Sequence, residues 1–247
     1  MANVTIQGLS VYYEKSGTKG KQVLLLHGWG QNTKMMDFIA KFLAKHFRVY
    51  NLDFPGFGNS QEPNVPWGCE DYTELLHDFC VKNKISNPII IAHSFGCRIA
   101  IHYAYKYEAS KMVLTGAAGI KDKRSLSWYI KTYSYKLAKK VLPDSVVASY
   151  QNKVGSDDYK NSTGVMRQTF VKVVNDDVID ILPKITNETL LVFGELDEAT
   201  PLSKGKLMEK LMPNATLVVF EGDDHYAYFN EAARFNNVLD AFLRSEY

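Results

Sequence analysis

The stretch Pro88–Ala104, PIIIAHSFGCRIAIHYA, decides the fold of this chain. It begins with a β-branched apolar run, typical of a strand buried on both faces of a parallel sheet, and continues with helical spacing. Ser94 stands between the two runs, with Ala92 and Gly96 two positions away on either side. Small residues there let a strand and the next helix approach closely, and the side chain between them then projects above the sheet. Serine is also common in ordinary turns, so the rest of the chain must decide whether Ser94 is a nucleophile.

The same alternation of strand and helix recurs along the chain. Apolar runs that end in glycine-rich or polar loops occur at 21–30, 48–60, 111–119, 188–201 and 215–229. Runs with helical spacing follow most of them, and an alternating hairpin pattern precedes them near the N-terminus. This order predicts an α/β fold with a doubly wound, mostly parallel sheet. The segment 119–183 has helical periodicity and no strong strand, so we expect a core of 1–118 and 184–247 interrupted by a helical cap of 119–183.

Composition excludes several classes of function. The 247 residues are 46% hydrophobic and 23% charged, with a net charge of +2 and no charged block, which gives no case for nucleic acid or for a membrane surface as a partner. The odd number of cysteines and the N-terminus without signal-peptide features predict free thiols and a cytoplasmic location. We expect a small-molecule substrate and either a monomer or a homodimer.

Three loops after other strands carry further candidate residues. His27 to Gly30, HGWG, ends the first apolar run, Asp197 lies in the loop of VFGELDEATP, and His225 lies in the loop of FEGDDHYAYF. A loop histidine in that place can take a proton from a serine, and an aspartate can hold it in the right tautomer. A metal site at His225 with its two neighbouring aspartates is a weaker alternative, because no second histidine is suitably spaced.

In these motifs the chain resembles the α/β-hydrolase family over nearly its whole length. The turn around Ser94 resembles the family's GxSxG nucleophile elbow, with Ala92 in place of the first glycine, and Gly194, Asp197 and Pro201 match its acid loop. The resemblance implies a catalytic triad of Ser94, Asp197 and His225. It also implies an oxyanion hole made by the backbone N–H groups of Trp29 and Phe95, and it requires neither a metal nor an organic cofactor.

Residues that contact the substrate are predicted less directly. Candidates near the elbow are His93, beside the nucleophile, and Arg98, one helical turn later. Candidates in the cap are Trp128, Met166 and Phe170, because a cap covers the mouth of the site. In one branch of the family, a menaquinone-pathway synthase, an arginine at the offset of Arg98 binds a substrate carboxylate.

The sequence favours a serine hydrolase acting on a small carboxylic ester. Three alternatives stay open: a carbon–carbon bond hydrolase, a lyase acting on an acidic substrate, and a ligand receptor with slow turnover. Substrate choice depends on the cap, which carries no recognisable motif.

Overall fold

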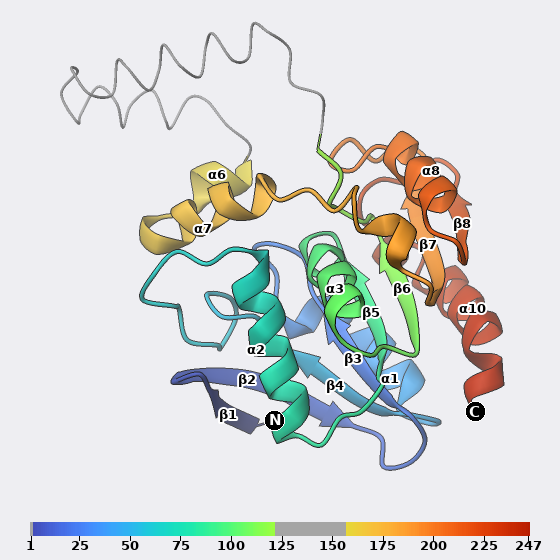
Figure 1. Cartoon of the computed structure of the whole chain (residues 1–247). Helices are drawn as coiled ribbons and strands as arrows, with labels where there is room; N and C mark the ends of the chain where they lie inside the picture. The colour runs from blue at the N-terminus through green and yellow to red at the C-terminus, as the bar shows by residue number, and fades with distance from the viewer. Residues whose placement is uncertain (1, 122–156) are drawn as a thin grey trace, which may run out of the picture.

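An eight-stranded sheet organises the computed structural model, which describes residues 2–121 and 157–247 (Figure 1). The strands lie in the order β1-β2-β4-β3-β5-β6-β7-β8. The first two strands pair as an antiparallel hairpin, β2 is antiparallel to β4, and every other neighbouring pair is parallel. The strands are β1 (Ala2–Ile6), β2 (Leu9–Ser16), β3 (Gln22–Leu26), β4 (Arg48–Leu52), β5 (Ile89–His93), β6 (Lys111–Thr115), β7 (Glu188–Gly194) and β8 (Ala215–Phe220). The predicted mostly parallel α/β sheet is confirmed.

Helices cover both faces of this sheet. The helices are α1 (Asp37–Leu43), α2 (Cys69–Lys82), α3 (Phe95–Lys106), α6 (Asp157–Asn161), α7 (Gly164–Val174), α8 (Leu202–Leu211), α9 (Ala227–Asn230) and α10 (Ala232–Leu243). Among the described residues, short 3₁₀ turns join or end them: η1 (Thr33–Met36), η2 (Leu182–Lys184) and η3 (Arg244–Glu246). Within the described parts of the chain, no helix is long and apolar enough to cross a membrane.

The central strands are apolar on both sides, which explains why their sequences are continuous apolar runs. In β3, Leu24 and Leu26 pack into a core layer with α2, α3 and α8, whereas Val23 and Leu25 pack against α1 and α10. Successive side chains of a strand point to opposite faces of the sheet, so a fully apolar strand needs helices on both faces.

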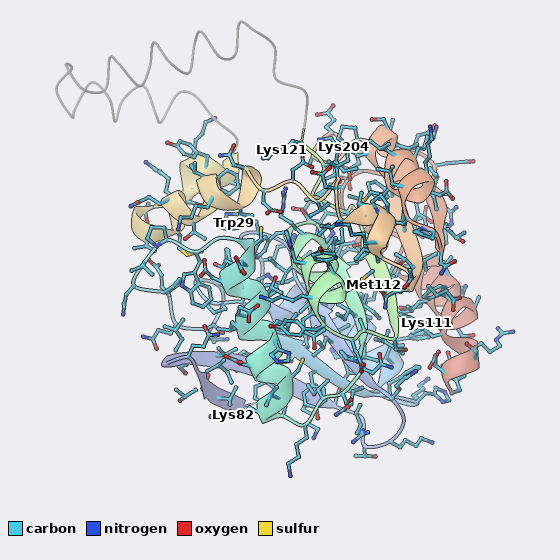
Figure 2. The ribbon with its side chains drawn as sticks, viewed as in Figure 1. Trp29, Lys82, Lys111, Met112, Lys121 and Lys204 are labelled. Carbon is cyan, nitrogen blue, oxygen red and sulfur yellow. The ribbon has the colours of Figure 1, made fainter. Side chains whose placement is uncertain are left out.

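The described part of the predicted cap is helical and lies over one end of the core. Figure 1 shows α6 and α7 above the end of α2. Trp29 lies on the side of the core that faces α7 (Figure 2), and its ring centroid is 5.1 Å from that of Phe170 on this helix. The backbone N–H of Trp67 donates to the hydroxyl of Thr169, 3.0 Å away. The boundaries 119–183 for a separate cap stay a prediction.

Candidate active site

Ser94 occupies the sharp turn between β5 and α3. Its backbone has φ 49° and ψ −108°, a conformation in which a residue with a Cβ atom is strained. The turn is held in place by its backbone, since the N–H of Ser94 donates to the carbonyl of Thr115, 3.0 Å away, and its carbonyl accepts from Cys97 at 3.1 Å. The side chain makes no helix-capping hydrogen bond. The turn therefore presents a hydroxyl that is not used for structure within the described residues.

Close packing of the backbone explains the small residue after this turn. A Cβ atom at Gly96 would lie 2.5 Å from the carbonyl oxygen of Leu26 and 2.8 Å from that of His27, both backbone atoms that cannot give way. Ala92, where the family motif has glycine, is fully buried in β5. The substitution at Ala92 is accommodated in a strand conformation, whereas Gly96 has no room for a side chain.

His225 is held by a buried carboxylate. Its Nδ1 lies 2.8 Å from Oδ2 of Asp197, which indicates that Nδ1 carries the proton and donates it to the carboxylate. Asp197 also accepts from Thr200 twice, from the backbone N–H at 2.7 Å and from the hydroxyl at 2.7 Å. These contacts fix the orientation of the imidazole and leave its Nε2 without a partner in the described parts of the chain.

The hydrogen bonds at Asp197 outweigh the effect of burial. Burial alone would raise the pKa of the Asp197 carboxyl, but the hydrogen bonds from His225 and Thr200 hold this pKa below its ordinary value. Asp197 is therefore ionised at neutral pH although only 4% of its surface is exposed. An ionised carboxylate here stabilises a positive charge on His225.

Gly116, at the end of β6, gives His225 its room. It has φ 49°, and a Cβ atom there would lie 2.9 Å from Nδ1 of His225 and 3.0 Å from Cε1. The same short loop contacts the turn at Ser94, since the N–H of Ala118 donates to the carbonyl of Ser94 at 3.3 Å. The end of β6 therefore positions the serine and the histidine together.

The loop after β3 brings a second backbone N–H group to the site. His27 is fully buried; its Nε2 accepts from the N–H of Phe54 at 3.0 Å and its Nδ1 lies 2.7 Å from the carbonyl of Gly28, which shapes the loop just before Trp29. No hydrogen bond among the described residues uses the N–H of Trp29. Phe95 is the first residue of α3, so its N–H has no partner within the helix. Both predicted oxyanion donors are thus available.

Asp53, in the loop after β4, has a structural role. Its two carboxylate oxygens accept from the backbone N–H of Thr33 at 2.6 Å and from that of Asn59 at 2.8 Å. A Cβ atom at Gly58 would lie 2.0 Å from Oδ2 of Asp53, so this turn of the loop requires glycine.

One cavity joins the candidate residues. It has a volume of about 420 Å³, and its wall contains Ser94, His225, Trp29, Phe95 and Arg98. Its more apolar part comes from α7 and from the loops after β6 and β7, with the residues Phe170, Val173, Val174, Ala118 and Ala199. Ser94, His225, the two residues predicted to form the oxyanion hole and two of the predicted substrate contacts therefore line one cavity. Asp197 is not in its wall and reaches the site through His225.

The prediction that His93 contacts the substrate is wrong for this structure. His93 is fully buried behind the cavity, with Nδ1 3.1 Å from the hydroxyl of Thr115 and its ring centroid 4.7 Å from that of His225. Burial, reinforced by the nearby His225, lowers its pKa well below the ordinary value, so it stays neutral. Alternation along β5 explains the error, because a residue next to Ser94 points to the opposite side of the turn.

The predicted cap residues have different positions. Phe170 lines the cavity of Ser94, whereas Met166 lines a neighbouring cavity of about 480 Å³ and packs against Gly56. Trp128 lies outside the described residues. The two cavities share the wall residues Trp29 and Tyr226. Met166 therefore lines the cavity next to that of Ser94 and not the cavity of Ser94 itself.

Arg98 is in the cavity wall, but it has a partner that the sequence did not reveal. Its Nη1 donates to the backbone carbonyl of Asp176 and lies 3.6 Å from the Oδ2 atom of that residue. Asp176 follows α7 in a segment without a recognisable motif.

Thr200, which donates two hydrogen bonds to Asp197, also has no motif of its own in the sequence. Only its place three residues after Asp197 could have drawn attention to Thr200.

The aspartates beside His225 have structural partners. Asp223 accepts from the side-chain amide of Asn230 at 2.8 Å, and Asp224 accepts from the N–H of Tyr226 at 2.7 Å. They therefore fix the loop before α9. These hydrogen bonds give each carboxylate a structural role that does not involve a metal ion.

A family model decides the relationship of the chain to known proteins. The model of the alpha/beta hydrolase family matches residues 23–238, which is most of the chain. The chain belongs to the alpha/beta hydrolase family. The strand order, with an antiparallel hairpin followed by a parallel sheet, and the turn at Ser94 agree with this membership.

Relatives in this family have several activities. The chain is 25% identical to a pimeloyl-[acyl-carrier protein] methyl ester esterase of Vibrio cholerae, with 95% of this chain and 98% of the relative covered. It is 25% identical to a proline iminopeptidase of Saccharolobus solfataricus, with coverages of 98% and 91%. A solved meta-cleavage product hydrolase from Pseudomonas fluorescens IP01 has a TM-score of 0.77 at 21% identity, covering 100% of this chain and 98% of that one.

Proposed function

We propose that this protein is a serine hydrolase that cleaves a small carboxylic ester through an acyl-enzyme. The observation that carries the proposal is that His225, paired with the buried Asp197, lines the same cavity as Ser94. A serine in a strained turn, an oriented imidazole and free N–H groups are the parts that acyl transfer needs. The similarity to a methyl ester esterase supports an ester as the substrate.

In the proposed mechanism, Ser94 attacks the ester carbonyl while Nε2 of His225 takes the hydroxyl proton. The N–H groups of Trp29 and Phe95 donate to the oxyanion that forms, and the Asp197 carboxylate stabilises the imidazolium. His225 then gives its proton to the leaving alcohol, and the C–O bond breaks to leave an ester of Ser94. Water activated by His225 hydrolyses this acyl-enzyme and releases the acid.

The other activities considered from the sequence have less support. Elimination from an acidic substrate calls for a positive charge in the cavity, and the charge of Arg98 is paired with Asp176. Carbon–carbon bond hydrolysis would use the same triad and differs in the substrate. A receptor would bind a ligand tightly and form little product.

Steady-state hydrolysis of p-nitrophenyl esters from acetate to octanoate tests the proposal. We expect the wild type to turn over the short esters and Ser94→Ala to be slower by at least about a thousandfold. Ser203→Ala is a matched control, because Ser203 is exposed on α8 and the chemical change is identical. Ester hydrolysis that is no faster in the wild type than in Ser94→Ala would contradict the proposal and favour one of the other three activities.

A further inference from the structure

A carboxylate from outside the nucleophile's helix meets one face of that helix. Oδ2 of Asp176 lies 2.8 Å from Nε2 of His102 and 3.6 Å from Nη1 of Arg98. Arg98 and His102 are four residues apart in α3, so their side chains share one face of the helix that begins after Ser94. Asp176 is therefore coupled to the site through the residue one helical turn from Ser94.

The guanidinium of Arg98 has unused hydrogen-bond donors in the cavity wall. The side chain is only 8% exposed, and Nη1 is engaged by Asp176. Nε is buried without a partner among the described residues, and no hydrogen bond within this part of the chain uses Nη2. Nε is enclosed, but Arg98 lines the cavity, so a bound substrate that supplies an oxygen acceptor to Nη2 gains affinity.

The charges around this donor cancel. Arg98 contributes one positive charge and Asp176 one negative charge. Burial alone would raise the pKa of the Asp176 carboxyl, but its hydrogen bond with His102 and the charge of Arg98 hold this pKa below its ordinary value. The buried thiol of Cys69, from α2, is neutral because burial and the nearby Asp176 raise its pKa. The opposite charges of Arg98 and Asp176 therefore compensate each other, and the guanidinium still offers hydrogen-bond donors.

Asp176, His102 and Cys69 also offer three atoms that suit a metal ion, all within 4.8 Å of one another. The guanidinium of Arg98 beside Asp176 opposes a cation at this place, since like charges repel across a poorly solvated gap. The ion pair with Arg98 already compensates the charge of the Asp176 carboxylate, so no metal ion is needed there. We therefore interpret Asp176, His102 and Cys69 as the polar surroundings of Arg98.

We propose that Asp176 is a specificity-determining residue of the esterase. By neutralising Arg98 it makes the cavity favour esters that carry a neutral oxygen acceptor, such as an ether, hydroxyl or second ester oxygen, over esters that carry a carboxylate. A carboxylate that enters the cavity loses solvation and meets an arginine whose charge is already compensated. This inference rests on the proposed ester hydrolysis.

Two substrates that differ by one methyl group test the inference. Methyl p-nitrophenyl adipate is neutral, and p-nitrophenyl hydrogen adipate is an anion at neutral pH. The measured quantity is the ratio of kcat/KM for the anionic ester to kcat/KM for the neutral one. We expect this ratio to be well below one in the wild type and to rise about tenfold or more in Asp176→Asn, where no carboxylate compensates the charge of Arg98. An unchanged ratio in a folded Asp176→Asn protein would overturn the inference.

A second variant covers the case in which Asp176→Asn fails to fold. Arg98→Met leaves the Asp176 carboxylate without its cation, so the ratio should fall severalfold below that of the wild type. A ratio in Arg98→Met that equals or exceeds the wild-type value would also overturn the inference. Asp180→Asn is the matched control, since Asp180 is exposed and the change in charge is the same; its ratio should equal that of the wild type.

Failure of the proposed function gives a different pattern. If the wild type hydrolyses neither ester faster than Ser94→Ala, the esterase proposal is wrong. Calorimetric binding of adipate and of dimethyl adipate to the wild type and to Asp176→Asn then measures the charge preference of the cavity directly. Binding of adipate that is not strengthened by Asp176→Asn contradicts the specificity role in that setting.

Discussion

The strain at Ser94 has a measurable energetic consequence. A residue with a Cβ atom at φ 49° and ψ −108° is destabilised by about 1–3 kcal/mol, whereas glycine adopts such a backbone easily. Ser94→Gly therefore relieves the strain, and Ser94→Ala retains it. Both variants lose the hydroxyl, which makes no capping hydrogen bond, so the comparison between them isolates the backbone.

The expected difference follows from two opposing effects. Glycine gains the relief of strain but loses about 0.4–1 kcal/mol relative to alanine, because its unfolded chain is more flexible. The net expectation is that Ser94→Gly is about 1 kcal/mol more stable than Ser94→Ala. For a chain of 247 residues this corresponds to a rise in Tm of about 2–4 °C.

Thermal and urea unfolding of the two purified variants, followed by circular dichroism, measure this difference. Both variants should be inactive, so the gain in stability would come with a complete loss of turnover. If Ser94→Gly is no more stable than Ser94→Ala, the turn is not strained in the way that its dihedral angles imply. Backbone strain would then play no role in presenting the side chain of Ser94.

Three further predictions concern His225 and its supports. Asp197→Asn should lower kcat for ester hydrolysis by about 10³–10⁴-fold, because the amide favours the wrong tautomer of His225; retention of most activity would show that another group orients the ring. Gly116→Ala should lower kcat at least about tenfold, because its Cβ atom would lie 2.9 Å from Nδ1 of His225, and unchanged kinetics would contradict this contact. The lowered pKa of Asp197 implies that the wild type keeps this stabilisation above the ordinary carboxyl value of 3.8 and loses it as the pH falls below that value. Acid unfolding of Asp197→Asn should accordingly depend less steeply on pH in that window, and parallel curves would refute the assignment.

The parts of the site that depend on short local motifs were predictable from the sequence. A buried strand followed at once by a helix locates Ser94, and the loops after other parallel strands locate Asp197 and His225 at the same edge of the sheet. Gly96 is predictable as well, because the approach of two backbones at a sharp turn requires a small residue.

The parts that depend on long-range packing were not predictable. Arg98 was singled out for its offset from Ser94, but its partner Asp176 is 78 positions away and nothing local marks it. The adjacency of His93 to Ser94 predicts a position in the pocket, whereas the alternation of the strand turns its side chain into the core. Adjacency in sequence predicts the position of a backbone better than the direction of a side chain.

Covalent labelling tests most directly the central claim that Ser94 is an activated nucleophile. The folded protein is treated with a fluorophosphonate, and its intact mass and tryptic peptides are measured. We predict one adduct per chain, in the peptide 85–98, with fragmentation assigning it to Ser94 and not to Ser86, and no adduct in Ser94→Ala. The absence of labelling in the folded wild type, or an adduct on another serine that persists in Ser94→Ala, would contradict the account.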